Sequence, residues 1–150
     1  MGVYLNPGND KFYKAINSEI YVDKTGLIQY TNRVFNTMQQ NVCVSRPRRF
    51  GKSMTANMLA AYYSRGCQSE KLFEEFKIAK DPSFRQHLNR YNVFFMNMQE
   101  FLSRSKTVEK MILRISQLLM RDLKQEYPDI AYFDETDLAE SMQDVYQHTG

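Results

Sequence analysis

Residues 45–53 read Ser45-Arg46-Pro47-Arg48-Arg49-Phe50-Gly51-Lys52-Ser53 and separate two apolar segments of different character. The segment before them, Asn41-Val42-Cys43-Val44, is short and β-branched, which predicts a buried strand with Cys43 as a small buried hydrophobe. The segment after them, residues 54–63, places Met54, Met58, Ala61 and Tyr62 on one helical face. A strand, a tight loop and a helix in this order form the context that a phosphate-binding loop requires.

The chemistry expected of this loop follows from its position before a helix. Backbone amides at the start of a helix have no carbonyl partner inside it, so they attract anions. Gly51 lacks a side chain, so a phosphate can approach the backbone there. The Lys52 ammonium would contact the outer phosphates, and the Ser53 hydroxyl would bind a bridging Mg²⁺ ion. The predicted nucleotide contacts are Arg46, Pro47, Arg48, Arg49, Phe50, Gly51, Lys52, Ser53 and Met54.

One position departs from the G-x-x-x-x-G-K-[ST] consensus, because Arg46 stands where the first glycine is expected. Gly-Lys-Ser triplets also arise by chance in many chains. The alternative is therefore a basic turn whose arginines face solvent. The strand before the loop and the helix after it favour the phosphate-binding interpretation.

Two segments, Tyr21-Val22-Asp23-Lys24-Thr25 and residues 45–53, resemble the N-terminal signatures of the predicted AAA-ATPase-like family of bacterial proteins. In that family S-R-P-R-R-F-G-K-S is the usual phosphate loop, which accounts for Arg46. The resemblance covers residues 6–103 and extends less closely beyond them. It implies ATP and Mg²⁺ as ligands and a role of residues 21–25 in shaping the base pocket. The residues alone favour the alternative, in which Asp23 is a helix cap and Tyr21 is a core residue.

The resemblance and the pattern together predict an α/β fold of the P-loop NTPase type, a three-layer arrangement with a parallel sheet. Residues 1–40 would form a helical region before the loop, and residues 41–150 the start of the α/β core. Val93-Phe94-Phe95-Met96-Asn97-Met98 predicts a second buried strand. Such a sheet usually has about five or six strands. We therefore expect the 150 residues to be the N-terminal part of a longer domain.

Helices are predicted elsewhere from capping residues and apolar spacing. One follows Asp10, another runs from Asp23 to Met38, and a third starts at Asp81-Pro82. The apolar stripe over residues 107–125 predicts the longest helix, packed against the sheet. Asp137 would cap a last helix from Leu138 to Gln147.

Asp134 and Glu135 follow the largely apolar residues 130–133, the form of a magnesium-binding, water-activating strand in ATPases. In that catalytic role Asp134 would hold the metal through water, and Glu135 would polarise the attacking water. Against it, Pro128-Asp129 precedes the segment and a helix cap follows it. These neighbours favour an exposed acidic turn, and hydrolysis is then expected only in the longer parent protein. In many family members a restriction-endonuclease-like nuclease domain follows, through which nucleic acid would be a partner.

Composition limits the remaining function classes. The net charge of +3 is too small to argue for nucleic-acid binding by itself, although Arg46, Arg48, Arg49 and Lys52 are concentrated locally. Neither a C-x-x-C pair nor a run of 18 apolar residues occurs, so a zinc site and a membrane span are not expected. We expect a cytoplasmic protein without a signal peptide. Two other hypotheses stay open: a nucleic-acid-binding module and a degenerate structural or interaction domain, neither hydrolysing nucleotide.

Overall fold

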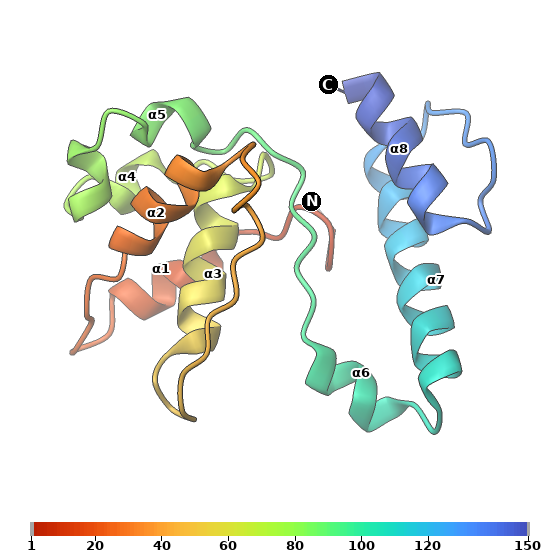
Figure 1. Ribbon diagram of the computed structural model, residues 1–150, viewed down its shortest axis with the longest axis horizontal. Coiled ribbons are helices and arrows are strands. Elements are labelled where there is room, and N and C mark those ends of the chain that lie inside the picture. Colours follow the sequence, from red (N-terminus) through yellow and green to blue (C-terminus); the bar gives the residue numbers. More distant parts are fainter. Residues whose placement is uncertain (1, 150) are drawn as a thin grey trace. The chain divides into compact units, whose positions relative to one another are not determined.

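The computed structural model describes residues 2–149, and these residues are mainly helical (Figure 1). Helices account for 53% of the chain and strands for 3%, and the described residues form no sheet. The elements in chain order are α1 (Asp10–Ile16), α2 (Gly26–Val34), α3 (Lys52–Tyr63), α4 (Glu70–Phe73), the 3-10 helix η1 (Lys77–Lys80), α5 (Phe84–His87), α6 (Met98–Arg104), α7 (Val108–Glu126) and α8 (Leu138–Thr149).

The expected α/β fold with a parallel sheet is wrong, because neither predicted strand forms. Residues 41–44 are irregular and exposed, so the expected burial of Cys43 is also wrong. Residues 93–97 contain only an isolated antiparallel bridge between Phe94 and Leu5, and α6 begins at Met98. A strand needs a neighbouring strand to pair its backbone groups. The apolar, β-branched composition of these segments predicted strands, but composition does not determine whether a second strand lies beside them.

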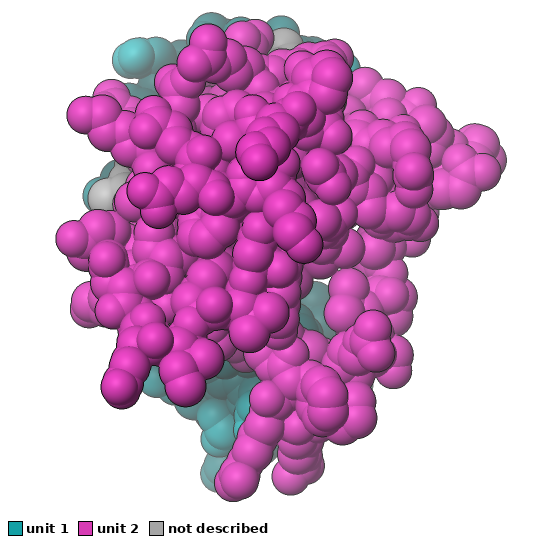
Figure 2. All heavy atoms as spheres, turned by 90° about the vertical axis from the view of Figure 1, so that its left-hand side faces the viewer, with its two compact units in different colours: residues 1–5, 94–150 teal, residues 6–93 magenta. Residues whose placement is uncertain are grey.

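The chain divides into two compact units, which are coloured separately in Figure 2. One unit comprises residues 6–93 and contains α1 to α5 together with the loop before α3. The other comprises residues 2–5 with residues 94–149 and contains α6 to α8. Each unit has its own cluster of buried apolar side chains.

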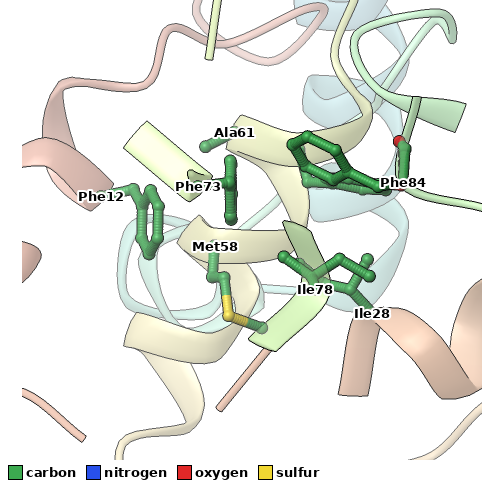
Figure 3. Packing of buried hydrophobic residues seen from close by; sticks show 8 residues of the cluster. Phe12, Ile28, Met58, Ala61, Phe73, Ile78 and Phe84 are labelled. Atoms are coloured by element: carbon green, nitrogen blue, oxygen red, sulfur yellow. Dashed lines mark hydrogen bonds between the residues drawn. The ribbon is translucent and has the colours of Figure 1, made fainter. Parts of the chain in front are cut away.

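Helix α3 supplies the centre of the core of residues 6–93 (Figure 3). Met58, Ala61 and Tyr62 are buried as the apolar spacing predicted, whereas Met54 on the same face is 41% exposed. They pack with side chains from α1, α2 and the segments after α3, namely Phe12, Ile28, Phe73, Ile78 and Phe84. The second half of α3 is therefore fixed by packing, while its first turn stays accessible.

The hydroxyl of Tyr62 connects α3 with its neighbours. It donates to the Phe84 carbonyl at 2.7 Å and accepts from the Asn32 amide at 2.9 Å. The Asn32 amide also donates to the Ser83 hydroxyl at 2.9 Å. Burial raises the pKa of Tyr62 to about 12, which keeps the phenol protonated at neutral pH. This one side chain thus links α2, α3 and α5.

In the other unit, Asp122 on α7 anchors the N-terminal segment. Its carboxylate is 1% exposed and accepts from the amides of Tyr4 at 2.7 Å and Leu5 at 3.3 Å. A guanidinium nitrogen of Arg121 lies 2.9 Å from the same carboxylate. Leu5 then joins a core that includes Met120, Leu123 and Val145.

Most of the predicted helices form, in contrast to the predicted strands. Helices α1, α3, α7 and α8 are confirmed, and the Thr107 hydroxyl caps α7 by accepting from the Lys110 amide at 3.3 Å. Helix α2 is shorter than expected, because it ends at Val34, and Met38 is 96% exposed. The expected packing of α7 against a sheet is wrong, since α7 contacts α6 and α8.

Replacing Tyr62 by Phe keeps the ring but leaves the Phe84 carbonyl without its buried donor. We expect the free energy of unfolding, measured by urea denaturation, to fall by roughly 1–3 kcal/mol. The folded pKa lies above the ordinary value, so wild-type stability should also decline as the pH rises from about 10 to about 12. The Tyr62→Phe variant should show a shallower decline. In the control Tyr13→Phe, at an exposed tyrosine, both properties should stay unchanged.

Candidate functional site

The loop before α3 is an exposed turn with two left-handed residues. Residues 45–50 are all exposed, and the turn lies at residues 48–51. Arg49 has φ 69° and Gly51 has φ 77°. Gly51 is the residue at which the chain enters α3, and its carbonyl accepts from the Thr55 amide at 2.9 Å. Non-glycine residues rarely adopt such a conformation, and they cluster at ligand-binding segments.

Two ammonium groups contact the backbone of this loop. Lys24 donates to the Phe50 carbonyl at 2.9 Å. Lys52, the first residue of α3, reaches back to the Arg46 carbonyl. Both lysines are exposed, so both ammonium groups remain accessible to an anion.

The positive φ of residue 51 favours glycine, because other side chains rarely adopt this conformation. A Cβ atom at this position would lie 2.5 Å from the Lys24 ammonium nitrogen, and the flexible lysine side chain could move away from it. The bare backbone of Gly51 therefore lies next to a cation.

A pocket of about 290 Å³ lies beside the loop within residues 6–93. Its walls come from the segment before α2, from the loop and from the first turns of α3: Ile20, Tyr21, Val22, Lys24, Arg49, Phe50, Gly51, Met54, Thr55 and Met58. Most of these side chains are apolar, and the two cations are Lys24 and Arg49. Small-molecule sites commonly combine apolar walls with a few polar groups that fix orientation.

Residues 21–25 are held in place by Asp23 and Thr25. The Asp23 carboxylate accepts from the Thr25 amide at 2.8 Å, the Thr25 hydroxyl at 2.7 Å and the Lys77 amide at 3.1 Å. The Thr25 hydroxyl in turn accepts from the Ile78 amide at 3.2 Å, and Thr25 is fully buried. These bonds connect the segment to η1. Asp23 does not cap α2 directly, since Thr25 is the residue that precedes this helix.

Two titratable groups of this segment have shifted pKa values. Burial acts to raise the pKa of Asp23, but hydrogen bonds from Thr25 and the Lys77 amide outweigh it and hold the pKa below its ordinary value. Burial and the nearby charge of Asp23 raise the pKa of Tyr21. The Tyr21 ring packs against Phe76, with 5.4 Å between centroids, and it also lines the pocket. Tyr21 is thus both a core residue and a pocket residue.

Asp134 and Glu135 lie in the other unit, on the turn before α8. The Asp134 carboxylate accepts from the amide of Thr136 at 2.8 Å and from its hydroxyl at 2.6 Å, and these bonds lower the pKa of Asp134. Glu135 forms an ion pair with Lys124. These contacts are those of an acidic turn whose carboxylates are bonded to Thr136 and Lys124, so the water-activating role stays a prediction without support from the geometry.

Sequence reasoning missed the contact of Lys24 with the loop and the bonds between residues 23–25 and η1. The Asp-x-Thr spacing is a local signal, because a carboxylate often accepts from the amide two residues later. That signal predicts a turn at Asp23. It carries no information about the contact of Asp23 with Lys77, which is 54 residues away. Nor does it predict the contact of Lys24 with Phe50, which is 26 residues away.

An exposed loop that enters a helix through a left-handed glycine, beside a pocket with two cations, is a geometry suited to a phosphorylated ligand. The model of the predicted AAA-ATPase family matches residues 8–150, and the chain belongs to this family. The resemblance noted from residues 21–25 and 45–53 is therefore confirmed. Membership supports nucleotide binding in general and does not favour the two alternative hypotheses.

Two other comparisons, with curated proteins and with solved structures, give no match. Among the helices of residues 2–149, none has the length and apolar character needed to cross a membrane.

Replacing Asp23 by Ala removes the acceptor for three donors. We expect the free energy of unfolding at pH 7 to fall by roughly 1–3 kcal/mol, because the Lys77 and Thr25 amides lose their partner. The folded pKa is lowered, so this contribution is present above the ordinary aspartate pKa of 3.8 and is lost as the pH falls through the folded pKa. Urea denaturation should therefore show the difference from wild type shrinking below about pH 4.

The matched control is Glu75→Ala, which removes an exposed carboxylate from the same unit. It should leave the free energy of unfolding within about 0.5 kcal/mol of wild type. Equal losses in the two variants would show that the contacts of Asp23 do not hold the segment.

Proposed function

We propose that the chain binds Mg²⁺-ATP, with the phosphates on residues 46–54 and the base in the adjoining pocket. The observation that carries the proposal is the entry of the loop into α3 through left-handed Gly51, with Lys52 and Lys24 bonded to the loop backbone. Membership of the predicted AAA-ATPase family supports it. The proposal concerns binding of the nucleotide and not its hydrolysis.

The phosphate part of the proposal rests on charge and access. The amides of the first turn of α3 lack carbonyl partners inside the helix, and they lie next to the exposed turn. An anion at this helix end is also favoured by the helix dipole. Lys52 extends from the first turn back over the loop to Arg46, so its ammonium lies where an outer phosphate would replace the carbonyl as its partner. Lys24 supplies a second ammonium group, which lies next to the backbone of Phe50 and Gly51.

Ser53 fits the role of a magnesium ligand. It lies in the first turn of α3, next to Lys52, and it is exposed. Mg²⁺ is commonly held by one or two protein oxygens, with the remaining positions taken by phosphates and water. The Ser53 hydroxyl would be the protein's share of the ligands. When bound, the ion would neutralise phosphate charge.

The pocket suits the base more than the whole nucleotide. Its volume of about 290 Å³ is close to the lower end of the range for small-molecule sites, roughly 300 Å³. Tyr21, Val22 and Met54 offer apolar and aromatic surface against which a flat ring can pack. The phosphates would then lie outside the pocket on the exposed loop, which matches the accessibility of residues 45–50.

Replacing Lys52 by Ala should weaken Mg²⁺-ATP binding. The lost contact is a charge-assisted hydrogen bond of roughly 1.5–3 kcal/mol, which corresponds to an affinity about ten- to hundredfold lower. Isothermal titration calorimetry measures the affinity. A thermal shift with millimolar Mg²⁺-ATP provides an independent readout, because ligand binding stabilises the folded state by mass action.

The matched control is Lys80→Ala, which removes an exposed lysine from η1 in the same unit and should bind nucleotide like wild type. A wild-type chain that shows no thermal shift with Mg²⁺-ATP would contradict the proposal and favour a degenerate domain. Unchanged affinity in Lys52→Ala would contradict the placement of the phosphates.

A further inference from the structure

A second, larger cavity lies in the unit formed by residues 2–5 and 94–149, and the nucleotide proposal does not use it. Its volume is about 680 Å³. It is lined by Val3 and Tyr4, by residues of α6 and α7, and by the connection between these helices. We call it the basic cavity, because five of its lining residues are cations: Arg104, Lys106, Lys110, Arg114 and Arg121.

The positive charge of the basic cavity is largely uncompensated. Glu100 is the one acidic residue among its lining residues, and it lies 3.4 Å from the exposed Arg104 guanidinium. Arg121 is paired with the buried Asp122 at 2.9 Å. For Lys106, Lys110 and Arg114 the described part of the chain shows no ion pair. Three cations therefore face the cavity without a carboxylate partner.

The cations on α7 form a row. Lys110, Arg114 and Arg121 lie at helical spacings of four and seven residues, so they share one face of the helix. At 1.5 Å per residue the row extends over about 16 Å. One phosphate group would engage only part of such a row, whereas a chain of phosphates could contact all of it. Arg114 also presents a planar fork that matches phosphate oxygens, whereas two nitrogens of the Arg121 guanidinium already donate to Asp122.

The cavity carries aromatic and apolar surface beside the cations. The Tyr4 ring lies against Phe101, with 5.4 Å between centroids, and Leu118 on α7 also lines the cavity. Tyr4 is fixed through its backbone: its amide donates to Asp122 at 2.7 Å, and its carbonyl accepts from the Phe95 amide at 2.8 Å. A ring held in this way next to a row of cations offers a surface on which a base can stack.

We propose that the basic cavity binds single-stranded nucleic acid, with the phosphodiester backbone along the row on α7 and a base against Tyr4. Cationic grooves with aromatic platforms are the common means of binding single strands without sequence preference. An acidic peptide would satisfy the cations but would not require the Tyr4 ring that lines the cavity beside them. The site is independent of the loop at residues 45–53, and it does not require the nucleotide proposal to be correct.

The test measures fluorescence anisotropy of a labelled single strand of about twenty thymidines titrated with the full chain. In Lys110→Gln/Arg114→Gln we expect the affinity at low salt to fall about tenfold or more. The slope of log affinity against log salt should become shallower by about 1.4, since two phosphate contacts are lost. Both residues are exposed, and thermal melting by circular dichroism checks that the variant folds.

A matched control removes two charges elsewhere. Lys71→Gln/Lys80→Gln changes two exposed lysines of the other unit and should bind the strand like wild type. The charge-preserving variant Lys110→Arg should also retain binding. Equal losses in the two double variants would show that only net charge matters, and they would overturn the proposal. So would a loss confined to Arg46→Gln/Arg49→Gln, since it would place the strand on the loop.

A second variant separates a nucleic acid from an acidic peptide. Tyr4→Leu keeps every cation but removes the stacking surface, so the affinity for the strand should fall about fivefold or more. Displacement of the strand by poly-glutamate should require far higher concentrations than displacement by unlabelled strand. Equal displacement by both polymers, together with unchanged affinity in Tyr4→Leu, would mean that the cavity accepts any polyanion, and it would overturn the assignment.

Discussion

The buried hydroxyl of Tyr62 is the interaction on which the arrangement around the loop depends. It is bonded both to α2, through Asn32, and to α5, through Phe84, so the second half of α3 cannot shift without breaking these contacts. Met58 and Ala61 are buried on the same helix. With one end of α3 fixed in this way, its first turn can stay exposed and still hold a defined position. The proposed binding of an anion at this helix end needs both properties, because the amides have to be accessible and correctly placed.

The residues around that helix end are ordered by a second set of contacts. Asp23 and Thr25 connect the segment before α2 to η1, and Lys24, which lies between them, reaches the Phe50 carbonyl. The residues of the signature at 21–25 therefore have separate structural roles. Asp23 and Thr25 fix the segment, and Lys24 between them contacts the loop. Tyr21 completes the pocket while it packs against Phe76.

In the second unit a buried carboxylate likewise positions a backbone segment, which here borders the basic cavity. The buried carboxylate of Asp122 holds the backbone of Tyr4 and Leu5 on α7, and Tyr4 thereby borders the basic cavity. Burial acts to raise the pKa of Asp122. The hydrogen bonds from the Tyr4 amide and Arg121 outweigh this effect, so the pKa lies below its ordinary value. In both units a carboxylate that accepts backbone amides joins segments far apart in the sequence. Such bonds are stronger than those between neutral groups.

Local sequence by itself determined where the longer helices α3, α7 and α8 lie. The spacing of apolar residues predicted α3 and α7, Thr107 and Asp137 marked helix starts, and residues 45–53 predicted a loop before α3. These features depend on neighbours within a few residues, so the local pattern contains the information. Only the tertiary structure decided whether Val42 and Phe95 belong to strands, since pairing requires a second segment at the right distance. It also decided that Lys24 lies against Gly51 and that Tyr4 lies beside α7, because contacts between distant residues depend on how the whole chain packs.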